Sequence, residues 1–443
     1  MSELVLSGVS RDTVRELVRR QGGPDWLASL RLHAWKLFEE LPVERSTMFV
    51  RHTDFRSIAL DSIDALPSSS TPPLPSELVR YIEGVEGSGA YVQLDHSSPR
   101  VTLREDLGKK GVVFADILPA LGEHTDLIEP VLKKRAIPPE EDKLVALNTA
   151  LFSSGPFLYV PSGVVVEEPL HIFDLRSKPA IGVFNLGIVV MGAESKAVLL
   201  REGYSDGTQL NGRQSLQSSV LEVHLGEGSE LSVGDIQRFA ENVVIFSHKR
   251  ALCGANSRLN WVTCGLGGRY LRSNTSAVLR GSGSDVQEVE VVFGSGQQHF
   301  DMASTLDHLG EHTRGDIYSK GVFRDQARGI FKGMINIGKT GRGTDSFLSE
   351  HSMLLNPGAS ADAIPALEIA TNEVKASHSA SVAQIDDEQL FYLTSRGIRE
   401  DEARKLVVRG FFESALAKVQ APLLRQRVGT LIEEKWGRSI EAR

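Results

Sequence analysis

Residues 226–286 read GEGSELSVGDIQRFAENVVIFSHKRALCGANSRLNWVTCGLGGRYLRSNTSAVLRGSGSDV, and a pattern of glycine, two variable residues and serine occurs in them three times. An upstream copy brings the total to four, starting at Gly192, Gly226, Gly254 and Gly281. In each copy an apolar residue stands two positions after the serine. Glycine permits the backbone angles of a tight turn, and serine can bond the backbone of its own turn. The pattern therefore predicts a recurring turn that leads into a strand.

The copies are 34, 28 and 27 residues apart, and the sequence between them is strand-like, without a helical pattern. Recurrence at such intervals is typical of stacked structural units. A β-sandwich, with strands at a regular spacing of about 8–12 residues, is the alternative. We favour a mainly β fold built on a β-helix or a similar solenoid.

Both flanks of this segment have helical patterns. Apolar residues recur at helical spacing between residues 27 and 41, and further helical signals lie at 115–134 and 142–152. Near the other end, Asp386 with Gln389 resembles a capping box, and Gly397 is well placed to end that helix. We expect a mainly helical N-terminal region over residues 1–140, a β-helix core over 141–375 and a helical C-terminal region over 376–443.

Composition limits the classes of function. The 443 residues include 49 lysines and arginines against 57 aspartates and glutamates, a net charge of −8, which argues against binding to nucleic acid or to an anionic membrane. The N-terminus lacks the basic and apolar parts of a signal peptide, and no apolar run approaches the roughly 18 residues that span a bilayer. We expect a cytoplasmic protein. Cys253 and Cys264 are too few for a disulfide framework or for a cluster site of their own, so we expect buried, inert thiols.

Residues 333–340, GMINIGKT, match the phosphate-loop pattern of nucleotide-binding proteins letter for letter. A phosphate loop must open a helix so that backbone N–H groups face the phosphates. Here the next residues, GRGTD, are poor helix formers, and the residues inside the supposed loop are strand-like. We therefore predict a strand and no nucleotide site.

His299, His308 and His312 lie close together in the sequence and are interspersed with three aspartates. Histidine and carboxylate side chains suit zinc or iron. In a strand, however, residues four apart are separated by about 13 Å, so we favour an interpretation as polar residues of the solenoid surface and turns. Because polysaccharide-active enzymes also use β-helices, the aspartates are an alternative acid and base pair for glycan cleavage. These aspartates are Asp301, Asp307 and Asp316.

Several motifs in one order are similar to the SufB/SufD family, which builds iron–sulfur clusters. The resemblance covers most of the chain from about residue 140 onward and rests on segments 155–163, 298–301, 307–308, 320–322, 328–333 and 352–398. It implies a right-handed parallel β-helix and a non-catalytic subunit. It also implies pairing with a SufB-like partner through the end of the β-helix, and binding of the ATPase SufC by the C-terminal helices.

Departures from the family pattern indicate a SufD-like member. Glu350 stands where SufB-like sequences have a cysteine, serines flank His378 where they have a Glu-His-Glu triplet, and Ala277 replaces another sulfur-handling cysteine. Many SufD-like chains have a cysteine just before this histidine, whereas here the position is Ala376.

The resemblance places His378 at the junction of the two subunits. Our hypothesis is that His378 supplies one ligand, or a proton-transfer group, to iron or to a transient cluster shared with the partner. Glu350 and His351 are weaker candidates for the same site. The alternatives are a residue that only completes the interface and, for the chain, a purely structural adaptor. The isolated chain is expected to hold no tightly bound cluster, and a homodimer remains open.

Overall fold

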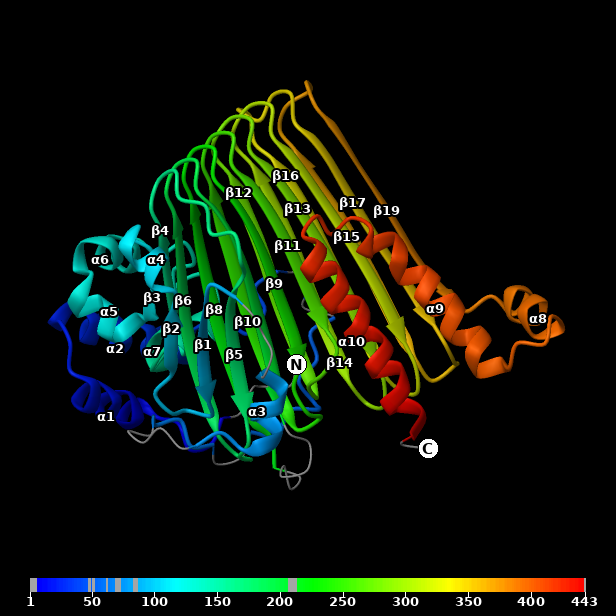
Figure 1. The fold of residues 1–443 in the computed structure, drawn as a ribbon, viewed down its shortest axis with the longest axis horizontal. Helices are drawn as coiled ribbons and strands as arrows, with labels where there is room; N and C mark the ends of the chain where they lie inside the picture. Colours follow the sequence, from blue (N-terminus) through cyan, green and yellow to red (C-terminus); the bar gives the residue numbers. More distant parts are fainter. Residues whose placement is uncertain are drawn as a thin grey trace.

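The computed structural model describes residues 6–46, 49, 52–60, 63–67, 73–82, 87–205 and 213–441. Its centre is a parallel β-solenoid of about eight turns, which confirms the predicted β-helix (Figure 1). Successive strands alternate between two sheets, so each turn of the chain adds one strand to each sheet. Among the described residues no helix is both long enough and apolar enough to cross a membrane.

Within the described residues, one sheet has ten strands and the other has nine. The first contains β1 (Gly89–Leu94), β2 (Arg100–Leu103), β5 (Leu170–Arg176), β7 (Lys196–Ser205), β9 (Glu230–Arg238), β11 (Arg258–Gly265), β13 (Asp285–Gly294), β15 (Arg314–Phe323), β17 (Asp345–Leu354) and β19 (Lys375–Gln384). The second contains β3 (Val113–Asp116), β4 (Pro156–Val160), β6 (Gly182–Met191), β8 (Ser215–Leu225), β10 (Val243–Cys253), β12 (Tyr270–Leu279), β14 (His299–His308), β16 (Arg328–Ile337) and β18 (Ser360–Ile369).

The predicted turn is confirmed in all four copies of the repeat. The serine hydroxyl donates to the carbonyl of the first glycine at 2.7–2.8 Å in each copy. The third residue of every copy has a positive φ, between 54° and 72°, whether or not it is glycine. The turns at residues 310–313 and 341–344 have the same geometry, with threonine donating to the glycine carbonyl. These two turns extend the series, because threonine carries the same hydroxyl group as serine.

The turns stack directly on one another, which explains the first glycine. A Cβ added to Gly281 would lie 2.0 Å from the backbone nitrogen of Ala255, in the preceding turn. No side chain fits at that distance. Glycine at this position therefore sets how closely consecutive coils approach.

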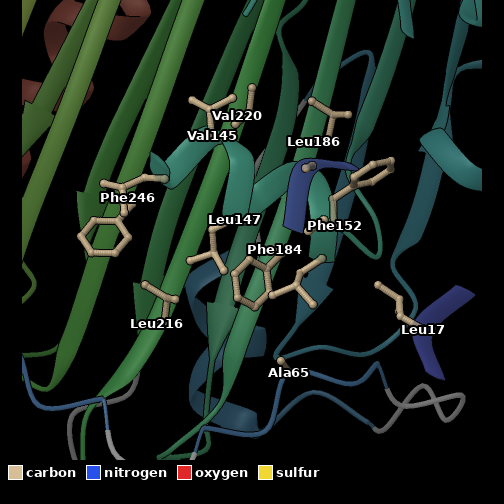
Figure 2. Packing of buried hydrophobic residues seen from close by; sticks show 14 of the residues in the cluster. Leu17, Ala65, Val145, Leu147, Phe152, Phe184, Leu186, Leu216, Val220 and Phe246 are labelled. Carbon is tan, nitrogen blue, oxygen red and sulfur yellow. The ribbon is translucent and has the colours of Figure 1, made fainter. Parts of the chain in front are cut away.

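Helices cover the outer faces of both sheets. The described N-terminal residues form α1 (Arg11–Gln21), α2 (Asp25–Glu40), α3 (Ser76–Ile82), α4 (Glu105–Lys109), α5 (Ile117–Glu123), α6 (Thr125–Lys133) and α7 (Lys143–Leu151). Leu147 and Val145 of α7 pack against apolar side chains of the nine-stranded sheet (Figure 2). Three helices follow the solenoid: α8 (Asp387–Ser395), α9 (Glu400–Leu416) and α10 (Pro422–Glu441). Helices α9 and α10 pack on the ten-stranded sheet, and α8 stands away from it (Figure 1).

The structure corrects the expected boundaries of the regions. The solenoid continues to Gln384, beyond the expected end at residue 375, so His378 lies on a strand and not at the start of the helical region. The sequence of β19, KASHSASVAQ, has few β-branched or aromatic residues. It is held as a strand by parallel pairing with β17 along its whole length. The expected N-terminal region also contributes β1, β2 and β3 to the two sheets.

The predicted start of the first C-terminal helix is confirmed. The Asp386 carboxylate accepts hydrogen bonds from the backbone N–H groups of Glu388 and Gln389 at 2.9 and 3.3 Å. Gly397, with φ of +87°, follows the end of α8. Local sequence therefore decides where the solenoid gives way to helices.

Candidate site at the open end of the solenoid

The two ends of the solenoid differ, and the end formed by β18 and β19 is called the open end below. At the N-terminal end, β2 and β3 pair antiparallel with β1 and β4. At the other end, β18 and β19 are the outermost strands of their sheets in the described part of the chain. The outer edge of such a strand presents backbone N–H and C=O groups that can pair with another chain. The open end is therefore a place for a partner to bind.

The strand register shows which residues face into the open end. Residues in register on neighbouring parallel strands point to the same side of the sheet, and His378 is in register with the buried, inward-facing Leu348. On β18 and β19 the inward positions are Ala361, Ala363, Pro365, Leu367, Ile369, Ala376, His378, Ala380, Val382 and Gln384. His378 is exposed and is the one ionisable side chain in that set, which lies wholly within the described residues. Apart from His378 and Gln384, the inward residues of these two strands are apolar.

Glu350 lies on β17, two residues beyond Leu348 on the same inner face, and is 1% exposed. Gly333, on the opposite sheet, leaves room for it, because a Cβ there would lie 2.6 Å from Glu350 Oε1. Burial and the Glu290 carboxylate raise the pKa of Glu350 from 4.5 to about 8, and the backbone N–H of Ile364 acts in the opposite direction. Glu350 is therefore a protonated acid at neutral pH, just behind the open end.

His351 points to the other side of the same strand. Its Nδ1 lies 2.6 Å from the hydroxyl oxygen of Ser381 on β19. Burial and the nearby Lys320 lower the pKa of His351. The structure thus brings Glu350 and His378 to one face of the first sheet and places His351 on the opposite face.

We expect the free energy of unfolding to fall as the pH rises from 4.5 to about 8. The unfolded chain releases the Glu350 proton near pH 4.5, whereas the folded chain keeps it until about pH 8. The folded state binds more protons throughout this window, so stability decreases as the pH rises. The full shift corresponds to roughly 5 kcal/mol, and solvent near the open end reduces the expected effect to about 2–3 kcal/mol.

Urea unfolding at a series of pH values measures the slope of the free energy of unfolding against pH. Glu350→Gln should reduce it, because glutamine has the shape of the protonated acid and does not titrate. Glu368→Gln, which removes an exposed carboxylate on β18, should leave it unchanged. An unchanged slope in Glu350→Gln would mean that another group causes the pH dependence.

Comparison with known proteins shows which family the sequence matches. Residues 175–411 match the family model described as "SUF system FeS cluster assembly, SufBD core domain". Residues 90–172 match the model described as "SufBD protein N-terminal region". The core match alone covers more than half of the chain and includes every solenoid strand from β6 to β19.

The chain belongs to the SufBD family.

Individual relatives agree with this assignment. The chain is 30% identical to "Iron-sulfur cluster assembly protein SufD" of Bacillus subtilis over 433 residues, which are 96% of this chain and 98% of that protein. It is 27% identical to the SufB protein of the same organism over 420 residues, 92% of this chain and 88% of that protein. A SufBD family protein of Staphylococcus epidermidis is 27% identical over 418 residues, with 92% and 88% covered. The stronger similarity to SufD agrees with the SufD-like features of the sequence.

The three other histidines considered for a metal site in this SufBD chain are separated by the fold. His299 packs on the outer face of β14 against the Tyr270 ring, at 4.9 Å between ring centroids. His308 faces inward, with Nδ1 2.8 Å from the Thr313 hydroxyl, and His312 lies in a turn. Burial lowers the pKa of both His299 and His308 to about 4. Within the described residues no three His, Cys, Asp or Glu side chains are placed to hold a metal ion.

The aspartates considered for glycan cleavage are also separated. Asp301 is buried on the outer face of β14 and lies 2.7 Å from Lys332 Nζ. Asp307, on the same strand, accepts a hydrogen bond from Asn336 at 2.7 Å. Asp316 lies on β15, in the other sheet. The arrangement does not form an acid and base pair around one cleft, so the glycan hypothesis is wrong.

The phosphate-loop pattern begins in a strand, and the two cysteines are buried, as predicted. Residues 333–337 lie within β16, and a turn rather than a helix follows. Cys253 packs in the interior of the solenoid, and burial raises the pKa of its thiol to about 12. Cys264 faces outward beneath the C-terminal helices, and burial also raises its pKa.

Sequence reasoning missed the buried acids Glu288 and Glu290. Both face into the solenoid from β13 and are at most 2% exposed. The signal was present, since β13 reads DVQEVEVVFG, with two glutamates spaced like residues on one face of a strand. Because helices cover the outer faces of the sheets, both faces of these strands are buried and the sequence pattern does not show which one is inside.

Proposed function

We propose that this chain is the SufD-like half of a SufB–SufD pair that works with a SufC-type ATPase to build and transfer nascent iron–sulfur clusters. In this proposal the chain is a scaffold without a catalytic step of its own, and the cluster is a transient cargo. The similarity to both a SufD and a SufB protein over almost the whole chain supports a role inside such an assembly. The free edges of β18 and β19 support pairing at the open end.

The observation that carries the proposal is the position of His378. It is the exposed, ionisable side chain that the last coil presents inward, and most of the other inward positions of β18 and β19 hold apolar residues. Imidazole is a good ligand for iron, and it also transfers protons near neutral pH. A partner that covers the open end would enclose His378 in the shared interface. His378 would then supply one ligand or one proton-transfer group, and the partner would supply the thiolates.

The C-terminal helices offer a separate surface for the ATPase. Phe391 and Tyr392 of α8 are 74% and 58% exposed, and α8 stands away from the solenoid (Figure 1). Exposed aromatic side chains are typical anchors of protein interfaces. ATP hydrolysis is assigned to that partner, since the phosphate-loop pattern of this chain begins in β16 and continues into a turn, not into a helix.

We expect His378→Ala to lower the iron and sulfide content of the copurified complex several-fold without dissolving the complex. The substitution removes the imidazole but leaves the backbone edge of β19 available for pairing. The chain is coexpressed with a SufB-like protein and a SufC-type ATPase, and the complex is assayed by size exclusion, visible absorption and metal analysis. His33→Ala, an exposed histidine of α2 paired with Glu140, is the matched control and should behave as the unsubstituted chain.

The same experiment separates the alternatives. Normal cluster content in His378→Ala would support a purely structural adaptor. Failure of the unsubstituted chain to bind either partner would overturn the proposed assembly itself.

A further inference from the structure

A polar pocket of about 260 Å³ lies on the outer face of the nine-stranded sheet. Strands β10, β12, β14 and β16 form its floor. Its walls come from Glu44, Arg45 and Phe49, and from the segment that leads into α7. Pockets for drug-sized ligands are commonly about 300–1,000 Å³, so this one suits a smaller molecule.

One row of residues crosses the floor of this pocket. His248, Asn274, Ala303 and Lys332 are in register on the four neighbouring strands. Adjacent strands are about 4.8 Å apart, so the methyl group of Ala303 leaves a gap between longer side chains. Arg272 stands two residues before Asn274 and therefore on the same face of β12. The pocket is the space that these longer side chains surround.

Two buried cations of the pocket keep donors that no described residue uses. Arg272 is 3% exposed and donates through Nη2 to Glu44 at 2.7 Å, whereas its Nε and Nη1 make no hydrogen bond. The Nη1 atom lies 3.8 Å from Asp301 Oδ2. Lys332 is also 3% exposed, and of its three N–H groups one is directed to a carboxylate, Asp301, at 2.7 Å. Because buried donors are seldom left unbonded, the pocket suits a ligand with acceptor atoms.

The same pocket holds an acceptor with spare capacity. Asp142 begins α7, and its Oδ1 accepts from the backbone N–H groups of Leu144 and Val145 at 2.6 and 3.2 Å. Its Oδ2 accepts from none of the described residues. His248 Nε2 lies 3.4 Å from Asp142 Oδ1 and makes no hydrogen bond. Burial alone would raise the pKa of Asp142, but His248 and Arg272 outweigh it and hold that pKa below its ordinary value.

The charges around the pocket have no positive surplus. Four cations are each paired with a carboxylate at 2.7–3.0 Å: Arg272 with Glu44, Lys332 with Asp301, Arg250 with Glu141 and Lys249 with Asp235. Apart from His248, this leaves one cation, Arg45, and two carboxylates, Asp142 and Asp307. An added anion would meet these carboxylates, and an added cation would meet the buried guanidinium and ammonium groups. A molecule that carries both charges avoids both costs.

We propose that this pocket binds a small zwitterion with one carboxylate and one ammonium group, of the chemical class of the α-amino acids. The ligand carboxylate accepts from Arg272 and Lys332, and the ligand ammonium group donates to Asp142. The Asn274 amide, which makes no hydrogen bond to any described residue, lies on the floor between these groups. None of these residues faces inward at the open end, so binding is independent of cluster assembly.

Isothermal titration calorimetry of the full-length chain tests this assignment. Glycine, L-alanine and L-serine are titrated separately, and propionate and ethylammonium represent the two halves of alanine. We expect at least one amino acid to bind about tenfold or more tightly than either half, because each half keeps only one set of charge-assisted hydrogen bonds. Propionate or inorganic phosphate binding as tightly as the amino acids would indicate an anion site and overturn the proposal. Absence of binding by all three amino acids would also overturn it.

Two variants test whether the ligand lies in this pocket. Ala303→Leu fills its floor, and Asn274→Asp adds a negative charge beside the ligand carboxylate with little change of volume. Each should weaken binding by about tenfold or more. Ala366→Leu on the outer face of β18 and Asn260→Asp on β11 are the matched controls outside the pocket, and they should bind as the unsubstituted chain does.

Near-ultraviolet circular dichroism shows which variants are folded. Unchanged affinity in a folded Ala303→Leu or Asn274→Asp variant would place the ligand elsewhere and overturn the proposal. Should one variant fail to fold, the other still provides the test, and the titrations of the unsubstituted chain need neither.

Discussion

Replacing Lys249 with methionine is expected to lower the free energy of unfolding by about 3–5 kcal/mol. Lys249 Nζ lies 3.0 Å from Asp235 Oδ2 inside the solenoid, and the two side chains are 0% and 1% exposed. Lys249 also donates to the Thr263 hydroxyl at 2.8 Å. Burial alone would raise the pKa of Asp235, but Lys249 and Arg201 outweigh it and hold that pKa below its ordinary value. Without the lysine, a buried carboxylate loses its nearest cation.

Urea unfolding measures the loss, and two further variants identify its cause. The double variant Lys249→Met with Asp235→Asn should recover part of the lost stability, because the orphaned charge is removed as well. Lys196→Met removes a comparable pair on the surface, 3.1 Å from Glu230 with both side chains at least 36% exposed. It should change stability by no more than about 0.5 kcal/mol. A loss below about 1 kcal/mol in Lys249→Met would mean that water reaches and solvates Asp235.

Replacing Glu222 with alanine is expected to cost about 3–4 kcal/mol and to loosen the N-terminal region from the solenoid. Glu222 is fully buried on β8, on the face opposite the interior. Its carboxylate pairs with Arg135 and accepts from the backbone N–H groups of Ala136 and Ile137 at 2.8 and 3.3 Å. Removing the carboxylate leaves a buried guanidinium and two buried N–H groups without their acceptor. The segment that contains Arg135, Ala136 and Ile137 connects α6 to α7. Loosening it should therefore weaken the packing of the N-terminal helices on the solenoid.

Limited proteolysis and urea unfolding together report the result. Glu222→Ala should be cleaved faster near residues 134–142 than the unsubstituted chain. Glu222→Gln keeps one acceptor oxygen, so its cleavage rate should lie between those of Glu222→Ala and the unsubstituted chain. Glu230→Ala removes a partly exposed glutamate and should leave the cleavage rate unchanged. Slow cleavage in Glu222→Ala would show that apolar packing of α7 alone holds this region, as drawn in Figure 2.

Much of the fold could be predicted because its signals are local. The turn at residues 281–284 needs glycine for close stacking, a positive φ at its third residue and a hydroxyl that reaches back to the first carbonyl. All of these depend on four consecutive residues. The helix at Asp386 likewise depends on one side chain and the backbone N–H groups of Glu388 and Gln389. By contrast, our prediction that residues 376–384 belong to the helical region is wrong, because pairing with β17 and not their own sequence makes them a strand.

The candidate site was predictable only in part. His378 was found through the family resemblance, but its strand, its exposure and its small apolar surroundings come from the structure. Glu350 was named as a weak candidate, and nothing in its own sequence shows that it is a buried, protonated acid. The partners Glu290 and Gly333 that give it this character lie on other strands.

The sequence by itself determined the repeating coil. Each turn is specified within four residues, and the residues after each turn specify the next strand. Only the tertiary structure decided which residues of different coils stand together. Glu290, Ser319 and Glu350 are far apart in the chain and meet because stacking puts their strands in register. Register depends on the lengths of all the coils between them, and it converts three separate polar residues into one buried column that ends at the open end of the solenoid.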